Sequence, residues 1–223
     1  MTSLARSLLA GLALAAAANL PARAAAESAV SCHCFRDRTF DPARPAAADP
    51  YLLATTRSSL LSAAFGPSKG SLVATVMGGT AAEDLWVAHW AGARAGRPAD
   101  ALLQAMREKG SWRAALAGAT GLGAAFEQAL GRGADRVELA ALAVDDVLAS
   151  RLGASPESIR ALRAAGATSE EAILASVLER RIEAPVLPLL RHVRAGRGSW
   201  GAVLHDAGLA PADIDGYVRS LVR

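Results

Sequence analysis

The sequence predicts an all-α protein made of two tandem, similar helical units packed as a helical bundle, and three observations support this. Apolar residues recur at the three- and four-residue spacing of a helix buried on one side. Start and stop signals such as Ser155-Pro156 and Gly153 bracket these runs. The segments GSWRAALAGA (110–119) and GSWGAVLHDA (198–207) resemble each other, and no apolar–polar alternation indicates a strand.

The first 26 residues have the parts of a cleaved export signal. Arg6 supplies a positive charge, residues 7–22 form an apolar run, and Ala24 and Ala26 provide an Ala-x-Ala cleavage site. The run is shorter than the about 20 apolar residues that a membrane-spanning helix requires. We therefore expect removal of the signal peptide 1–26, leaving a periplasmic or secreted protein without a stable membrane span.

The rest of the chain divides into a leader, two units and a connection. Residues 27–48 are rich in arginine, proline and alanine, which predicts an extended leader. Helical unit 1 is expected over 49–122 and helical unit 2 over 137–223, with the connection at 123–136. Two units of this size can close over a shared core of helices packed on helices.

The first helix of each unit is expected to end at a glycine. In unit 1, Asp49 and Pro50 predict the N-cap and first position of a helix that ends at Gly66. In unit 2 the corresponding helix is expected over 138–152, directly before Gly153.

The second helix is clearer in unit 2 than in unit 1. Ser155 and Pro156 begin the amphipathic segment 155–166. Its counterpart SKGSLVATVMGG (68–79) contains valine and threonine residues that favour a strand when it is considered alone. Because the repeat relates the two segments at an offset of 87 residues, we expect a helix in both.

The third and fourth helices also begin alike in the two units. TAAE (80–83) and TSEE (168–171) each place threonine at the N-cap and glutamate at N3, which predicts a capping box. The fourth helices are expected over 98–108 and 186–195.

A short final helix is expected after each Gly-Ser pair. Ser111 and Ser199 are its predicted N-caps, and Trp112 and Trp200 occupy its first turn. Matched positions in the two units favour a role for these two rings as structural anchors, with the indole N–H near the surface. A pair of related binding pockets is the alternative.

Five other residues are candidates for a binding surface. Trp86 and Trp90 lie on adjacent helical turns, occur only in unit 1, and would mark a docking surface if partly exposed. Arg191, Arg194 and Arg197 belong to a locally basic segment. Such a segment suits either a solvated helix face or a site for an anion or acidic partner.

The only two cysteines, Cys32 and Cys34, flank His33 in the leader. A closed zinc site takes four ligands, so these three residues do not predict a confident metal site. In an oxidising compartment the cysteines would pair, but a one-residue loop restrains the unfolded chain little. An exchange-capable dithiol and a passive local disulfide both stay open. Lipid attachment at Cys32 is disfavoured because Arg23 and Glu27 separate it from the apolar run.

Composition and motifs narrow the functional classes. The 223 residues are 52% hydrophobic and carry a formal net charge of +3, which falls to about +1 without the signal peptide. This weak charge and the export signal argue against a nucleic-acid partner. No Gly-x-Ser-x-Gly, His-Glu-x-x-His, Walker or dinucleotide-binding glycine pattern is present.

We therefore predict a cell-envelope binding or interaction protein without catalytic activity or cofactor, whose partner is another envelope protein. The alternative is a thiol–disulfide or metal-handling protein that uses Cys32, His33 and Cys34. The sequence does not predict the oligomeric state.

The segments CHCFRDRTFDP (32–42) and DPYLLATTRSSLLSAAFG (49–66), together with the export signal, resemble uncharacterised secreted bacterial proteins. The two GSW segments are similar to a Gly-x-Gly-Trp segment in small helical exported proteins. The resemblance implies an exported helical protein, and it carries over no catalytic residue and no ligand.

Overall fold

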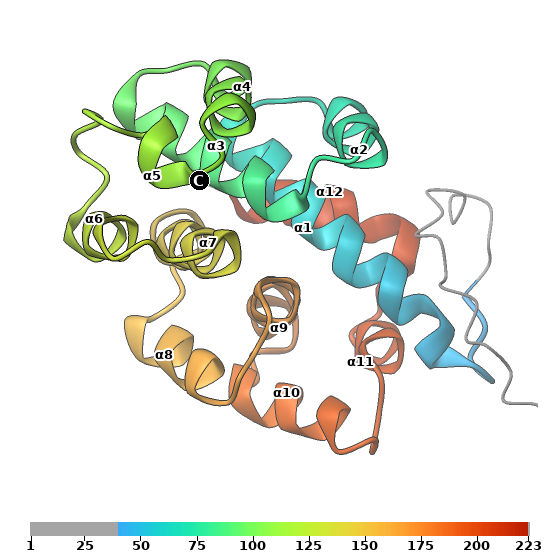
Figure 1. Cartoon of the computed structure of the whole chain (residues 1–223). Helices are drawn as coiled ribbons and strands as arrows, with labels where there is room; N and C mark the ends of the chain where they lie inside the picture. Colours follow the sequence, from blue (N-terminus) through green and yellow to red (C-terminus); the bar gives the residue numbers. More distant parts are fainter. Residues whose placement is uncertain (1–39, 223) are drawn as a thin grey trace, which may run out of the picture. The chain divides into compact units, whose positions relative to one another are not determined.

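Helices are the only regular secondary structure in residues 40–222, the part of the chain that the computed structural model describes (Figure 1). The all-α prediction is therefore confirmed for these residues. The signal peptide and the Cys32–Cys34 segment lie outside them. In chain order the elements are η2 (Pro45–Ala48), α1 (Asp49–Phe65), α2 (Lys69–Met77), α3 (Ala82–Ala95), α4 (Ala99–Lys109), α5 (Trp112–Ala115), α6 (Ala124–Gly131), α7 (Arg136–Leu152), α8 (Pro156–Ala164), α9 (Ser169–Ile182), α10 (Val186–Arg194), α11 (Trp200–Asp206), η3 (Pro211–Asp213) and α12 (Ile214–Leu221), where η marks a 3-10 helix.

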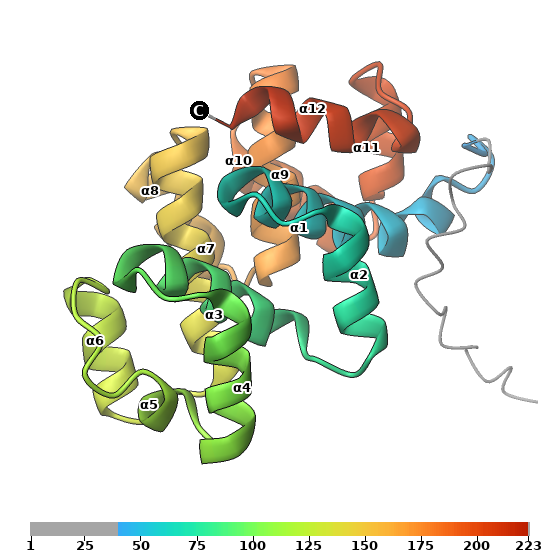
Figure 2. The ribbon, with the colours of Figure 1, turned by 90° about the horizontal axis from the view of Figure 1, so that it is seen from above.

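The helices α1, α3, α7 and α9 form the centre of the described core (Figure 2). α3 packs along α7, and α1 packs along α9 and α12, so each 17-residue helix contacts the 14-residue helix of the other predicted unit. Leu60, Val87, Val147 and Leu174 are among the buried aliphatic side chains. Burial of each stabilises the fold by about 1.5–3 kcal/mol. Residues of both predicted units belong to one continuous hydrophobic cluster.

Three helix pairs agree in length between the two halves of the chain, whereas α4 and α10 have 11 and 9 residues and α5 and α11 have 4 and 7. α1 and α7 each have 17 residues, α2 and α8 each have 9, and α3 and α9 each have 14. The second member of each pair begins 87 residues after the first. The left-handed glycines Gly66 and Gly153 end the first pair, and Ser68 and Ser155 cap the second pair. Descent of the two halves from one duplicated unit stays a prediction.

The capping-box prediction is right in one half and wrong in the other. The Thr168 hydroxyl accepts from the Glu171 N–H, and the Glu171 carboxylate accepts from the Thr168 N–H. The N-cap of α3 is Ala81, without a side-chain hydrogen bond. The Thr80 N–H already donates to the Thr75 carbonyl at the end of α2, so this threonine belongs to the preceding helix ending. At the 87-residue offset, the counterpart of Thr168 is Ala81.

The first helix begins one residue earlier than predicted, and its start contacts α11. Asp49 is the first helical residue rather than the N-cap, which is Ala48. The Asp49 carboxylate instead accepts from the Gly201 N–H at 2.8 Å. A Cβ atom on Gly201 would collide with the Pro45 carbonyl, so the glycine allows η2 to lie against α11. Residues 45–48 of the expected extended leader are thus a 3-10 helix, and the connection expected at 123–136 contains helix α6.

Candidate functional site

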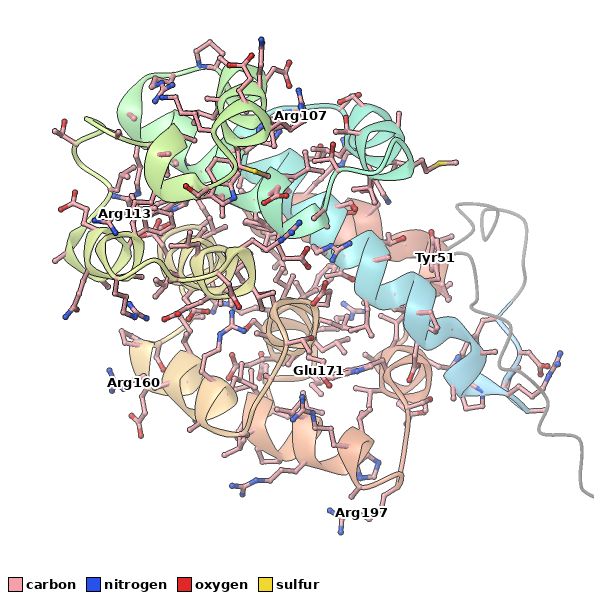
Figure 3. All side chains as sticks on the ribbon, viewed as in Figure 1. Tyr51, Arg107, Arg113, Arg160, Glu171 and Arg197 are labelled. Atoms are coloured by element: carbon pink, nitrogen blue, oxygen red, sulfur yellow. The ribbon has the colours of Figure 1, made fainter. Side chains whose placement is uncertain are left out.

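A groove between α1, α2 and the C-terminal helix α12 is the candidate functional site. Its volume is about 550 Å³. It is lined by two side chains from α1, three residues from α2 and three from the C-terminal segment: Tyr51, Thr55, Lys69, Gly70, Val73, Ala212, Asp215 and Arg219. Figure 3 shows Tyr51 on α1, near the start of that helix. The volume falls within the about 300–1,000 Å³ range of small-ligand pockets.

α2 forms an apolar wall of this groove and is weakly buried. The Ser68 hydroxyl caps its N-terminus by accepting from the Ser71 N–H at 3.1 Å. Leu72 is its only buried side chain. Met77 is 77% exposed and Val76 is 38% exposed, which makes them two of the three large apolar side chains exposed among residues 40–222. An apolar helix of this kind is normally buried on all sides.

One face of α2 carries no charge along its length. Gly70, Val73, Ala74 and Met77 follow the i, i+3, i+4, i+7 spacing that places residues on one helix face. Gly70, Ala74 and Met77 are exposed, and Val73 is half-buried. This face borders the groove through Gly70 and Val73.

The matching helix α8 has a polar surface at the equivalent positions. Glu157 stands 87 residues after Gly70, and Arg160 stands 87 residues after Val73. Both are exposed, and Figure 3 shows Arg160 projecting away from α8. The buried residues of α8 are Ile159 and Leu162, so this helix has one apolar and one solvated side. The uncharged outer face is therefore a feature of α2 and not of both helices.

The polar side of the groove is an ion cluster around Asp215. Its carboxylate accepts from the Ser59 hydroxyl at 2.5 Å and lies 3.3 Å from the Lys69 Nζ and 3.0 Å from an Arg219 Nη. Burial opposes ionisation, but the Ser59 hydrogen bond and the nearby Lys69 and Arg219 charges together hold the Asp215 pKa below its usual value. Two cations share this carboxylate, and the Arg219 side chain is 54% exposed.

The three arginines of the candidate binding surface differ in their surroundings. Arg194 bridges α10 to the end of α8 by donating to the Ala165 and Gly166 carbonyls at 2.7 and 2.8 Å. It also pairs with Glu171 at 2.6 Å. The hydrogen bonds that Arg194 donates to the Glu171 carboxylate raise the Arg194 pKa. Arg191 and Arg197 are exposed, and Figure 3 shows Arg197 pointing outward after α10. Arg194 therefore holds helices together.

Trp86 and Trp90 are core residues. Their docking role depended on exposure, and they are 1% and 3% exposed. The Trp90 Nε1 donates to the Asp146 carboxylate at 2.9 Å, and the Arg94 guanidinium lies over the Trp90 ring. The Trp86 ring meets Phe65 edge-on at 6.3 Å. Neither indole contributes to a surface.

The predicted anchor tryptophans are also buried, in different polar surroundings. Trp112 is 5% exposed, and its Nε1 donates to the Asp84 carboxylate at 2.8 Å rather than to solvent. Arg136 reaches the other oxygen of Asp84 at 3.2 Å. Trp200 is 2% exposed. Ser111 and Ser199 cap the short helices α5 and α11 as predicted.

A second cavity, of about 630 Å³, lies where α8, α9 and α10 meet. Its walls include Glu179, Arg180 and Glu183. Burial raises the Glu179 pKa, although Arg180 and the Val186 N–H oppose this shift. The Arg180 guanidinium donates a hydrogen bond to the Leu152 carbonyl at the end of α7. Ala154, Ala184 and Pro185 supply its apolar lining.

Metal-binding clusters and membrane-spanning helices are absent from residues 40–222. No group of three or more histidine, cysteine or carboxylate side chains there is placed to hold a metal ion. No helix within that range combines the length and apolar composition needed to cross a membrane. Cys32, His33 and Cys34 lie outside the described residues, so their thiol or metal chemistry stays a prediction.

The groove residues were missed by reasoning from the sequence. Its three contributing segments, near 51–55, 69–73 and 212–219, are far apart along the chain. The detectable feature was the segment 68–79, whose valine and threonine residues favour a strand and whose single charged residue is Lys69.

Comparison of the chain with protein-family models, with curated proteins and with solved structures gave no match.

Proposed function

We propose that this chain is an exported cell-envelope protein that binds another protein through the groove between α1, α2 and α12, and that it acts by binding rather than by catalysis. The export signal in residues 1–26 supports the location. The observation that carries the proposal is the uncharged, exposed outer face of α2.

Exposed apolar side chains on a helix favour an interaction surface. Each retains the solvation cost that burial would remove, about 25 cal/mol per Å² of apolar surface. Met77 and Val76 are adjacent in sequence and lie on α2, the helix that supplies Gly70 and Val73 to the groove, unlike scattered single surface residues. Lys69 and Arg219 both pair with Asp215 in the groove. Two cations on one carboxylate leave an excess positive charge that a partner can contact.

We also infer that the two halves arose by duplication, and that α2 and α8 then diverged. The equal lengths of the first three helix pairs and the 87-residue offset that these pairs share support this inference. Under it, the same position holds the exposed Arg160 on α8 and Val73 on α2. The position pair 73 and 160 therefore gives a matched test.

The test compares co-purification by tagged full-length variants from the cell envelope. Val73→Glu should reduce recovery of the specific partner at least tenfold, because a carboxylate replaces an apolar contact in the groove. Arg160→Glu introduces the same residue at the matched position and should leave recovery unchanged. Equal recovery by the two variants, with both folded by circular dichroism, would refute the proposal.

A further inference from the structure

We propose that the α1–α2–α12 groove recognises a short peptide segment in which a carboxylate lies beside a large apolar side chain. This inference rests on the proposed function and names the chemistry of the partner. The carboxylate would contact Arg219, and the apolar side chain would lie against Val73.

The carboxylate preference follows from the charges in the groove. Lys69 and Arg219 both contact Asp215, so these three side chains together carry an excess positive charge. A guanidinium has five N–H donors in a planar fork, and Asp215 faces one Nη of Arg219 at 3.0 Å. The exposed remainder of the fork suits a second carboxylate, which arginine binds through parallel hydrogen bonds.

The apolar preference follows from α2. Val73 lines the groove between Gly70, three residues before it, and Met77, four residues after it, and Lys69 is the one charged residue of α2. A Cβ atom built on Gly70 would meet no atom within 4 Å, so a ligand can approach the helix backbone there. A leucine-sized side chain can therefore lie beside Val73 while its neighbour reaches Arg219.

The size of the groove favours a short segment over a second copy of the chain. Eight residues line it. A stable protein dimer usually requires about 20–30 residues from each partner. The partner is thus expected to present a few residues from within its chain, and tighter binding of a free C-terminal carboxylate than of the internal Asp peptide would contradict this source.

The experiment is a double-mutant cycle measured by fluorescence polarisation. Labelled, amidated Gly-Leu-Asp-Leu-Gly and Gly-Leu-Asn-Leu-Gly serve as probes, and a peptide ending in Leu-Leu with a free carboxylate tests a C-terminal source. On the wild-type protein the Asp peptide should bind about tenfold more tightly than the Asn peptide, as expected for one charge-assisted contact. On Arg219→Gln the two should bind alike.

Two further variants keep the test decisive. Asp215→Asn removes the internal competitor and should strengthen binding of the Asp peptide but not of the Asn peptide. Arg160→Gln, on the matched helix, should change neither affinity. Equal binding of both peptides to wild type, or no binding of any probe at millimolar concentration, would overturn the carboxylate inference. The envelope co-purification dependence on Val73 could still hold in that case, which separates this inference from the proposed function.

Discussion

At the residue scale, the most consequential polar group is a buried carboxylate. Asp84 is the one charged side chain among residues 40–222 that is classed with the core, at 2% exposure. It accepts from the Trp112 Nε1 and from Arg136, and so joins α3 to α5 and α7. Its counterpart in the second half is Glu171, which serves the capping box and Arg194 instead. The same position therefore stabilises different contacts in the two halves.

Removal of the Asp84 carboxylate should destabilise the protein strongly. In Asp84→Ala the buried Trp112 N–H loses its acceptor, and we expect the free energy of unfolding to fall by about 3 kcal/mol. Asp84→Asn keeps an acceptor oxygen and should lose less than half of that. Urea unfolding followed by tryptophan fluorescence measures both. Equal, small losses below about 1 kcal/mol would contradict this role.

The half-buried His89 should lower the stability of the folded protein in acid. Burial lowers its pKa, and Asp100 opposes this shift. The folded state therefore holds fewer protons on His89 than the unfolded state, whose histidine titrates near 6.5, and stability falls as the pH drops below that value. His89→Gln should lose this part of the decline between pH 7.5 and 5.5, and Asp100→Asn should steepen it. Denaturant unfolding across this range is the measurement, and parallel curves for all three proteins would exclude the mechanism.

At the element scale, arginine side chains hold helix ends against neighbouring helices. Arg194 binds the end of α8, Arg180 binds the last carbonyl of α7, and Arg181 binds the Ala207 carbonyl after α11. The final carbonyls of a helix lack intrahelical donors and carry partial negative charge, which these guanidinium groups satisfy. This use explains much of the basic character of α9 and α10.

The pair Arg194 and Arg191 tests this role on one helix. Arg194→Ala removes two carbonyl contacts and the Glu171 pair, so we expect a loss of about 1–2 kcal/mol in the free energy of unfolding. Arg191→Ala removes an exposed side chain and should change stability by less than about 0.5 kcal/mol. Thermal and urea unfolding compare the two variants. A loss for Arg191→Ala as large as that for Arg194→Ala would show that general charge, rather than helix-end contacts, matters.

Helix positions were predictable where local chemistry decides them. Ser155, Thr168 and Ser199 cap the helices expected from their side chains. The capping prediction for Thr80 was wrong because its N–H donates to the Thr75 carbonyl at the end of the preceding helix. That hydrogen bond depends on the Gly78-Gly79 turn and not on the threonine side chain. Burial of Trp86 and Trp90 was not predictable, because it depends on packing of α3 against helices distant in sequence.

At the scale of the whole molecule, the central helices interlock across the two halves. α1 packs on α9 and α7 packs on α3, so neither half would bury its long helix alone. The all-α class could be predicted from composition and periodicity. The packing of α1 on α9 and of α7 on α3 could not, because contacts between helices distant in sequence determine it. The groove lies at the edge of this arrangement. There α12 packs beside α1, and α2 buries only Leu72.

The most direct test of the central claim is site-specific photocrosslinking in intact cells that express the full chain. A photoreactive amino acid would replace Val73 or Met77 on α2, or the matched Arg160 or Ala164 on α8. The α2 positions should give a discrete crosslinked product that Arg219→Gln weakens, and the α8 positions should give none. The same product from both helices, or from neither, would contradict a binding function for the α1–α2–α12 groove.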